Sequence, residues 1–173
     1  MADVARYSAI ETLRNGRRVE IRALRPEDRA GMLAAVERVG AESLYRRFFA
    51  VRRGFAEPEI DFFVNVDFVE HVALVAVVED AGRPVIVGGA RYIVLRPGQA
   101  EVAFAVVDAY QGQGIGAVLM RHLAIIAREA GLRELIADVL PENLAMLKVF
   151  GKSGLDLTTR HGTGIVHVAL HLT

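Results

Sequence analysis

The sequence of 173 residues contains no cysteine and has no excess of charge of either sign. Without cysteine the chain can form no disulfide framework, no thiolate zinc site and no cysteine nucleophile, and this composition is typical of a reducing compartment. The 21 basic and 21 acidic side chains give a formal net charge of zero. Because proteins that bind nucleic acid need a basic excess to contact phosphates, we expect no nucleic-acid partner.

Long apolar runs and metal-binding spacings are also missing. The longest apolar run, at residues 72–78, is far shorter than the ~18 residues of a membrane span, and residues 1–14 lack the apolar stretch of a signal peptide. The five histidines follow no His-Glu-x-x-His pattern. We therefore expect a cytoplasmic protein with no membrane partner and no metal.

The apolar patterns predict one domain of mixed α and β structure. With 53% hydrophobic residues, a chain of this size buries enough surface to fold as one domain. We place this domain at residues 18–173, after an N-terminal arm at residues 1–17. The expected strands lie at 19–24, 71–79, 85–95, 100–107, 134–139, 155–160 and 165–172, and the expected helices at 26–39, 41–50, 115–130 and 141–153, with a short helix after Pro58.

The connections predict how these strands pair. Short turns join the strands at 71–79, 85–95 and 100–107, and such turns allow only antiparallel neighbours. The strand at 134–139 follows a long helix, so we expect it to pair in parallel. The predicted fold is of the α/β (α+β) class, with a mixed, mostly antiparallel sheet of about seven strands flanked by four to five helices.

A glycine-rich loop is the most informative segment for function. It reads QGQGIGA over residues 111–117 and stands between a strand and a helix. Glycines let backbone N–H groups approach a ligand closely, and a helix start adds unpaired N–H donors and the positive end of the helix dipole. This combination predicts a phosphate-binding site. A plain strand-to-helix turn is the simpler alternative.

Two other phosphate-binding motifs fit this sequence less well. Residues 112–117 match the dinucleotide fingerprint, and Asp138 lies near the place of its ribose-binding acid, but that motif belongs in the first turn of an alternating βαβ fold. Residues 151–153 (Gly-Lys-Ser) resemble the end of a P-loop, but its leading glycine would fall at Met146.

A third motif fits better. The pattern Gln-x-x-Gly-x-Gly at residues 111–116 resembles the acetyl-CoA pyrophosphate loop of the GNAT acetyltransferase superfamily. Asn143 and Phe150 resemble positions in the segment that follows in that family, and the order of elements is similar over residues 18–172. Three further segments resemble the GNAT domain of bacterial protein lysine acetyltransferases that act on acyl-CoA synthetases, and these lie at residues 22–28, 43–49 and 67–76.

The resemblance implies an N-acetyltransferase that uses acetyl-CoA as co-substrate and no metal. Loop N–H groups would hold the pyrophosphate, and an N–H at the end of the preceding strand would bind the thioester oxygen. Asn143 would hold the pantetheine arm, although a helix cap is an equal alternative. The cofactor-binding residues implied in this way are Val106, Val107, Gln111, Gly112, Gln113, Gly114, Ile115, Gly116, Ala117 and Asn143.

Glu101 is the catalytic residue that the resemblance implies, as a general base. A lysine amine has a pKa near 10.4 and is protonated at pH 7, so the reaction needs a group that takes its proton. In a strand, Glu101 shares a face with Ala103 and Ala105, whose small side chains leave room for an acceptor. The alternative is that Glu101 is a solvated charge at a strand end.

One position departs from the family pattern. Many members have a tyrosine that protonates the leaving thiolate, and Phe150 occupies the matching position here. A thiol with a pKa near 8.5 can leave without that acid. Tyr110 and Tyr92 are the other candidates for a general acid, and we expect Phe150 to be a core aromatic residue.

The acceptor is the least defined part of the prediction. The resemblance implies a protein lysine, for example on an acyl-CoA synthetase, and we expect a bare acetyltransferase domain without the appended domains of some relatives. A small-molecule amine or a protein N-terminus is the alternative acceptor, and a non-catalytic CoA-binding regulatory module is the alternative from another class. The basic, aromatic residues 45–53 form an amphipathic helix, an acceptor-docking edge or, least in keeping with the net charge of zero, a nucleic-acid patch. A monomer and a homodimer are both compatible with the sequence.

Overall fold

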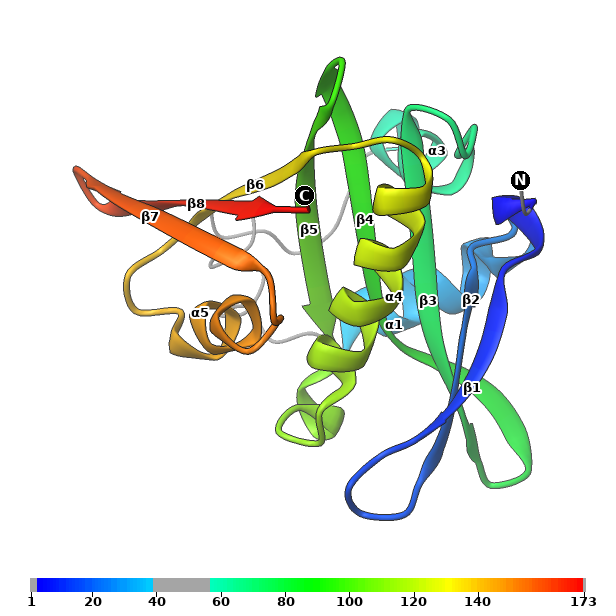
Figure 1. Cartoon of the computed structure of the whole chain (residues 1–173). Helices are drawn as coiled ribbons and strands as arrows, with labels where there is room; N and C mark the ends of the chain where they lie inside the picture. The colour runs from blue at the N-terminus through cyan, green and yellow to red at the C-terminus, as the bar shows by residue number, and fades with distance from the viewer. Residues whose placement is uncertain (1–2, 39–56, 173) are drawn as a thin grey trace.

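A computed structural model describes residues 3–38 and 57–172 of the chain. An open sheet of eight strands forms its centre, in the order β1-β2-β3-β4-β5-β6-β8-β7 (Figure 1). The strands are β1 (Ser8–Thr12), β2 (Arg18–Ala23), β3 (His71–Asp80), β4 (Arg83–Arg96), β5 (Gln99–Val106), β6 (Glu134–Val139), β7 (Asp156–Gly162) and β8 (Ile165–His171). The described helices are α1 (Arg29–Glu37), α3 (Glu57–Val64), α4 (Ile115–Glu129) and α5 (Leu144–Gly151), with 3-10 turns η1 (Val4–Arg6), η2 (Pro26–Asp28) and η3 (Asp108–Tyr110).

The pairing of the strands confirms the predicted mixed, mostly antiparallel sheet. Every neighbouring pair is antiparallel except β5 and β6. These two strands pair in parallel and are connected in the chain by α4. The eighth strand, β1, was not predicted, because its residues lie in the segment expected to be an arm. Its side chains alternate between exposed and half-buried, so they carry no clear apolar pattern.

Of the first two predicted helices, one lies almost entirely within the described residues. The helix expected at 26–39 begins as the 3-10 turn η2 and continues as α1. The helix expected at 41–50, with Leu44, Phe48 and Phe49 facing inward, lies outside the described residues. None of the described helices is long and apolar enough to cross a membrane.

The sheet carries helices on both faces. In Figure 1, α4 crosses one face of β3, β4 and β5, and α1 lies behind them. Alternate residues of β3 point to opposite faces: Leu74 packs into the main core with Leu119 of α4, whereas Val75 belongs to a smaller cluster with Met32 of α1. Because both faces are covered, residues 71–78 are buried without interruption.

The sheet opens between β5 and β6. These strands pair only at Gln99↔Glu134, Ala100↔Leu135 and Glu101↔Ile136. The five residues of β5 after Glu101 pair with β4 alone, while β6 continues along β8. The peptide groups on one edge of β5 therefore face an opening in the sheet rather than a neighbouring strand.

A partly buried ion pair fixes the start of α1 against β2, with the Arg22 and Asp28 side chains 12% and 10% exposed. The two guanidinium nitrogens of Arg22 donate to the two carboxylate oxygens of Asp28 at 2.7 and 2.9 Å, and the Arg25 N–H also donates to Asp28. Burial by itself raises the pKa of Asp28, but the hydrogen bonds from Arg22 and Arg25 outweigh it and hold that pKa below its ordinary value.

We expect Asp28→Asn to lower the free energy of unfolding by about 2 kcal/mol, because it leaves the partly buried Arg22 charge without its partner. A carboxyl whose pKa is lowered on folding stabilises the protein above its ordinary pKa near 3.8, and this stabilisation is lost as the pH falls through the folded-state pKa. In urea denaturation between pH 3 and 7, the free energy of unfolding of the variant should therefore decrease less at acid pH than that of the wild type.

The control is Asp3→Asn, because Asp3 forms an exposed ion pair with Arg6 at 3.6 Å. That substitution should change stability by less than about 0.5 kcal/mol. Equal effects of the two substitutions would contradict the importance of the Arg22–Asp28 pair.

Candidate active site

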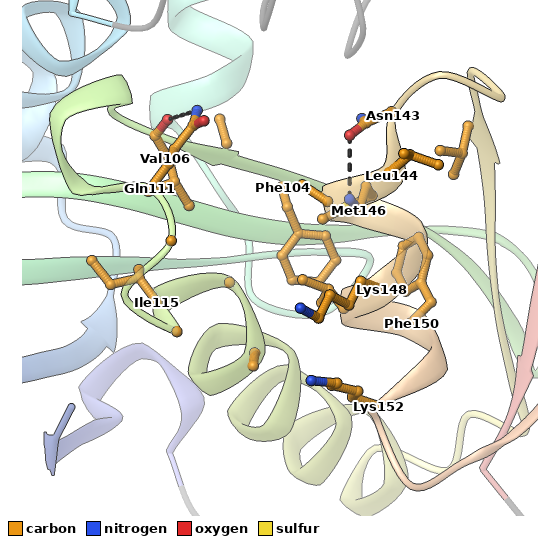
Figure 2. A pocket seen from close by; sticks show the side chains of 18 of the residues that line it. Phe104, Val106, Gln111, Ile115, Asn143, Leu144, Met146, Lys148, Phe150 and Lys152 are labelled. Atoms are coloured by element: carbon orange, nitrogen blue, oxygen red, sulfur yellow. Dashed lines mark hydrogen bonds between the residues drawn. The ribbon is translucent and has the colours of Figure 1, made fainter. Parts of the chain in front are cut away.

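A cavity of about 520 Å³ occupies the opening between β5 and β6. Its walls are β5, β6, the start of α4 and one side of α5 (Figure 2). This volume lies within the range of small-molecule binding sites. The residues that line it are Arg14, 102–106, 110–112, 114–117, 137–139, 143–146, 148–150 and Lys152.

The glycine-rich loop forms one end of this cavity and has the backbone of an anion site. Gly112 and Gly114 have φ values of +80° and +94°, a region that other residues adopt only with strain. Gly114 is the N-cap of α4 and no side chain caps this helix, so the first N–H groups of α4 have no acceptor within the helix. These donors and the positive end of the helix dipole favour a bound phosphate.

Gly116 allows a second helix to approach the same loop. A Cβ atom at Gly116 would lie 3.3 Å from Cγ2 of Val149 in α5, which is tighter than ordinary packing. The absence of a side chain therefore lets α5 lie close to the N-terminus of α4. The loop and α5 become two walls of one cavity.

Three cationic side chains line the cavity that holds this loop. Arg14 comes from the turn between β1 and β2, Lys148 comes from α5, and Lys152 is the C-cap residue directly after α5. Figure 2 shows that both lysine side chains extend from α5 and its C-terminal end toward α4. They are the only two lysines of the sequence. Because they lie four residues apart, both lie on one face of α5, and the cavity is positive beside the anion-binding helix end.

Val106 and Val107, the two valines predicted to bind a thioester oxygen, direct their N–H groups to opposite edges of β5. The Val107 N–H donates to the Val87 carbonyl of β4 at 2.8 Å, and Val107 does not line the cavity. Successive residues of an antiparallel strand direct their peptide groups to opposite edges, so the Val106 N–H faces the opening. The Val106 carbonyl, on the same edge, accepts from the Gln111 side chain at 3.0 Å (Figure 2).

Glu101 lies outside the lining of the cavity but next to its opening. Its side chain is exposed and shares a face of β5 with Ala103 and Ala105, both of which line the cavity. Phe104, on the opposite face, also lines it. The cavity therefore reaches both faces of the sheet through the opening, and Glu101 stands on the face opposite α4.

His71 is a second titratable group on the face of Glu101. The register places His71 opposite Ile93, which is opposite Glu101 on the next strand. Burial, and after it the nearby Arg91 charge, lower the pKa of His71 to about 4. The Arg91 guanidinium also lies 2.8 Å from the His71 Nε2 atom, which accepts its hydrogen bond. His71 is therefore a neutral, weak base at neutral pH, whereas Glu101 is a carboxylate on the same face.

Asn143 and Phe150 lie together in the wall formed by α5. The Asn143 Oδ1 atom accepts from the Met146 N–H at 3.2 Å and caps α5, and its amide also lines the cavity (Figure 2). Phe150 is 1% exposed and packs edge-to-face on Phe104, with ring centroids 5.9 Å apart. Phe150 is thus a core residue, as predicted.

Neither tyrosine considered as a general acid presents a free hydroxyl to the cavity. Tyr92 is buried in the core, and burial together with the Asp67 charge raises its pKa to about 12. Tyr110 does line the cavity, but its hydroxyl donates to Asp80 at 3.2 Å.

The structure brings most of the predicted binding residues to one cavity. The exceptions are Val107 and Gln113, which do not line the cavity. The side-chain oxygen of Gln113 instead accepts a hydrogen bond from the Asn15 side chain at 3.1 Å. Sequence reasoning did not assign Arg14, Lys148 or Lys152 to this site, although the four-residue spacing of the lysines was a signal for the last two. Among residues 3–38 and 57–172, no group of three or more His, Asp or Glu side chains is placed to hold a metal ion.

Comparison with known proteins assigns this architecture to a family. The model of the acetyltransferase (GNAT) family matches residues 32–155. The chain belongs to the GNAT family. The family and the names of its relatives indicate that the chain is an acyltransferase.

Individual relatives support the same assignment. An acetyltransferase of Pseudomonas aeruginosa is 36% identical over 138 residues, which are 79% of this chain and 74% of that protein. The acetyltransferase Pat of Mycolicibacterium smegmatis is 35% identical over 158 residues, which are 89% of this chain but only 46% of that protein. The crystal structure of the GNAT domain of S. lividans PAT is similar with a TM-score of 0.85 and 33% identity, covering 95% of this chain and 96% of that one.

The cap of α5 can be tested apart from any ligand. We expect Asn143→Ala to lower the free energy of unfolding by about 1 kcal/mol, because the Met146 N–H loses its acceptor. Asn143→Asp keeps a side-chain oxygen at that position and should stay close to wild type in urea denaturation. Equal losses in both variants would show that the cap contributes little.

Proposed function

We propose that this GNAT protein transfers the acetyl group of acetyl-CoA to the ε-amine of a protein lysine. The observation that carries the proposal is the cavity in the opened sheet, which has an anion-binding helix end on one side and reaches the face of Glu101 on the other. An elongated donor with phosphates at one end and a thioester at the other suits this shape. A transferase needs donor and acceptor to meet, and the opening gives access from both faces.

The donor side is supported by the chemistry of the cavity wall. The pyrophosphate would bind at the N–H groups of residues 112–117, where Gly112 and Gly114 keep Cβ atoms out of the way. Arg14, Lys148 and Lys152 supply positive charge for the remaining phosphate. The apolar residues toward Phe104 suit the pantetheine arm, and the Asn143 amide N–H groups are donors for its carbonyl oxygens.

The proposed reaction is a direct attack by the lysine amine. Glu101, directly or through a water molecule, takes a proton from the ammonium group, and the free amine then forms a C–N bond to the thioester carbonyl carbon. Deprotonation at pH 7 costs roughly 4–5 kcal/mol for a lysine with a pKa near 10.4, so a positioned base is required. The C–S bond then breaks and the CoA thiolate leaves. The attacking nitrogen loses its second proton to water and becomes the amide N–H, and the thiolate gains a proton from water.

Val106 is the proposed donor to the thioester oxygen. Negative charge develops on this oxygen as the amine attacks, and a backbone N–H aimed at it stabilises the transition state. The Val106 N–H faces the opening, because the Val107 N–H on the opposite edge is already hydrogen-bonded to Val87. The proposal therefore uses Val106 and not Val107.

The proposal that the acceptor is a protein lysine is supported by relatives and not by the shape of the cavity. Two of the similar proteins carry the names Pat and PAT, and the sequence resembles the lysine acetyltransferases that act on acyl-CoA synthetases. We therefore propose an acyl-CoA synthetase as the first acceptor to assay. A small-molecule amine, a protein N-terminus and a regulatory module that binds CoA without turnover are the outcomes that compete with it.

An acceptor screen tests this proposal. Purified acyl-CoA synthetases are incubated with the protein and acetyl-CoA, and modified lysines are mapped by mass spectrometry. The variant that carries both Lys148→Arg and Lys152→Arg is a useful reference enzyme, because it keeps both cavity charges and has no lysine of its own to be acetylated. Acetyl-CoA binding without acetylation of any acceptor would instead favour the regulatory module.

We expect Glu101→Gln to lower kcat at least 100-fold at neutral pH, because a glutamine cannot take the proton of the ammonium group. The dissociation constant for acetyl-CoA should stay within twofold of wild type, since Glu101 lies outside the cavity lining. Glu79→Gln, at an exposed end of β3, is the matched control and should keep full activity. A Glu101→Gln enzyme that acetylates at the wild-type rate would refute the base assignment.

Gly114→Ala should weaken acetyl-CoA binding by about tenfold, because a residue with a Cβ must leave the φ of +94° that directs the loop N–H groups into the cavity. Gly82→Ala is the control, since Gly82 has a φ of +78° and equally open surroundings, but in a turn away from the cavity. Both variants should lose about 1–2 kcal/mol of stability. Calorimetric titration should separate them, and equal affinity in both would count against the loop.

A further inference from the structure

Asp138 is the acidic residue in a cavity whose other charged lining residues are basic. It lies on β6 and lines the cavity together with Arg14, Lys148 and Lys152. Its carboxylate is 46% exposed and its Oδ1 atom lies 2.5 Å from the Nδ1 atom of His167 on β8. The proposed donor is an anion, so a carboxylate in the same cavity would repel it and would not help to bind it. This residue therefore points to the other substrate.

The position of Asp138 in the sheet supports an acceptor role. Ile136 is opposite Glu101 in the last parallel pair of β5 and β6, and Asp138 is two residues further along. Side chains two apart in a strand share a face, so Asp138 and Glu101 lie on the same face of the sheet. Two residues span ~7 Å along a strand. The two carboxylates thus flank the opening from its two sides.

His167 holds the carboxylate of Asp138 in place. A carboxylate can only accept, so the Nδ1 atom of His167 carries the proton and donates it. The imidazole packs over Gly162 of β7, where an added Cβ would lie 3.1 Å from the Nε2 atom. The ring is therefore held between β6 and β7, and the second oxygen of Asp138 remains available to accept from a ligand.

The charge of a lysine explains why such a group is needed. A lysine side chain arrives protonated at pH 7, and the Arg14, Lys148 and Lys152 charges on the cavity walls repel it. A carboxylate at the opening offsets this repulsion and gives the ammonium group a hydrogen-bond acceptor. Contact with an anion also keeps an amine protonated, so this group acts on capture of the acceptor, before Glu101 takes the proton.

We propose that Asp138 binds the ammonium group of the acceptor lysine at the opening between β5 and β6, and that His167 is the positioning residue for this carboxylate. The inference rests on the proposed transfer of acetyl groups to lysine. It assigns to Asp138 a contact with the acceptor and none with the donor.

The test measures steady-state kinetics of the full chain with acetyl-CoA and a purified acyl-CoA synthetase as the acceptor. Asp138→Asn should raise KM for the synthetase about tenfold, leave kcat within twofold and leave the calorimetric Kd for acetyl-CoA unchanged. Asp156→Asn is the matched control, because Asp156 is an exposed aspartate of β7 that does not line the cavity. An unchanged Kd and melting temperature also show that the Asp138→Asn protein is folded.

The role of His167 has its own pair of variants. His167→Ala removes the donor to Asp138 and should raise the KM for the synthetase. His167→Asn keeps a side-chain N–H near the place of Nδ1, so its KM should be close to that of the wild type. A structural role alone would lower the melting temperature of both variants without this difference in KM. Failure of His167→Asn to restore KM would overturn the positioning role.

The outcomes for Asp138 separate this inference from the proposed function. If the wild-type protein acetylates no lysine of the synthetase, the proposed function fails and the inference fails with it. If the wild type acetylates the synthetase but Asp138→Asn has the KM of Asp156→Asn, only the inference is overturned. A weaker Kd of Asp138→Asn for acetyl-CoA would also overturn it, because it would assign Asp138 to the donor.

Discussion

The early end of pairing between β5 and β6 is the constraint on which the rest of the site depends. After Glu101↔Ile136 the two strands separate, and one edge of β5 loses its neighbour. Backbone N–H groups that would be used inside a complete sheet then face a cavity, as at Val106. The same separation connects the two faces of the sheet. The side with the start of α4, where we propose that the donor binds, and the side of Glu101 become two ends of one passage.

The elements around the opening compensate for the missing strand contacts. The edge-to-face contact of Phe104 with Phe150 ties β5 to α5 across the cavity wall, and Asn143 caps α5 at the same place. Gly116 lets α5 lie close to α4. On the other side of the sheet, the Arg22–Asp28 pair fixes the start of α1. The opening is thus enclosed by packed helices, which keeps its walls in place while its interior stays accessible.

Much of the fold and part of the site could be predicted from the sequence, because the signals were local. The alternation around Glu101 predicted its face, and the glycines of residues 111–117 predicted a loop between a strand and a helix, where Gly112 and Gly114 adopt positive φ values. Other features depend on segments that only folding brings together. Strand β1 has no apolar alternation and is recognisable only by its pairing with β2. Arg14 joins Lys148 and Lys152 across more than 130 positions in the chain. The divergence of β6 from β5 follows from tertiary packing, so no local pattern indicates it.

A crystal structure of the chain with acetyl-CoA tests the central claim most directly, which is that the donor lies in the opening of the sheet. The account predicts the pyrophosphate at the N-terminus of α4 and the thioester oxygen ~3 Å from the Val106 nitrogen, with the acetyl group directed toward the face of Glu101. Acetyl-CoA bound elsewhere, or with its thioester turned away from β5, would contradict it.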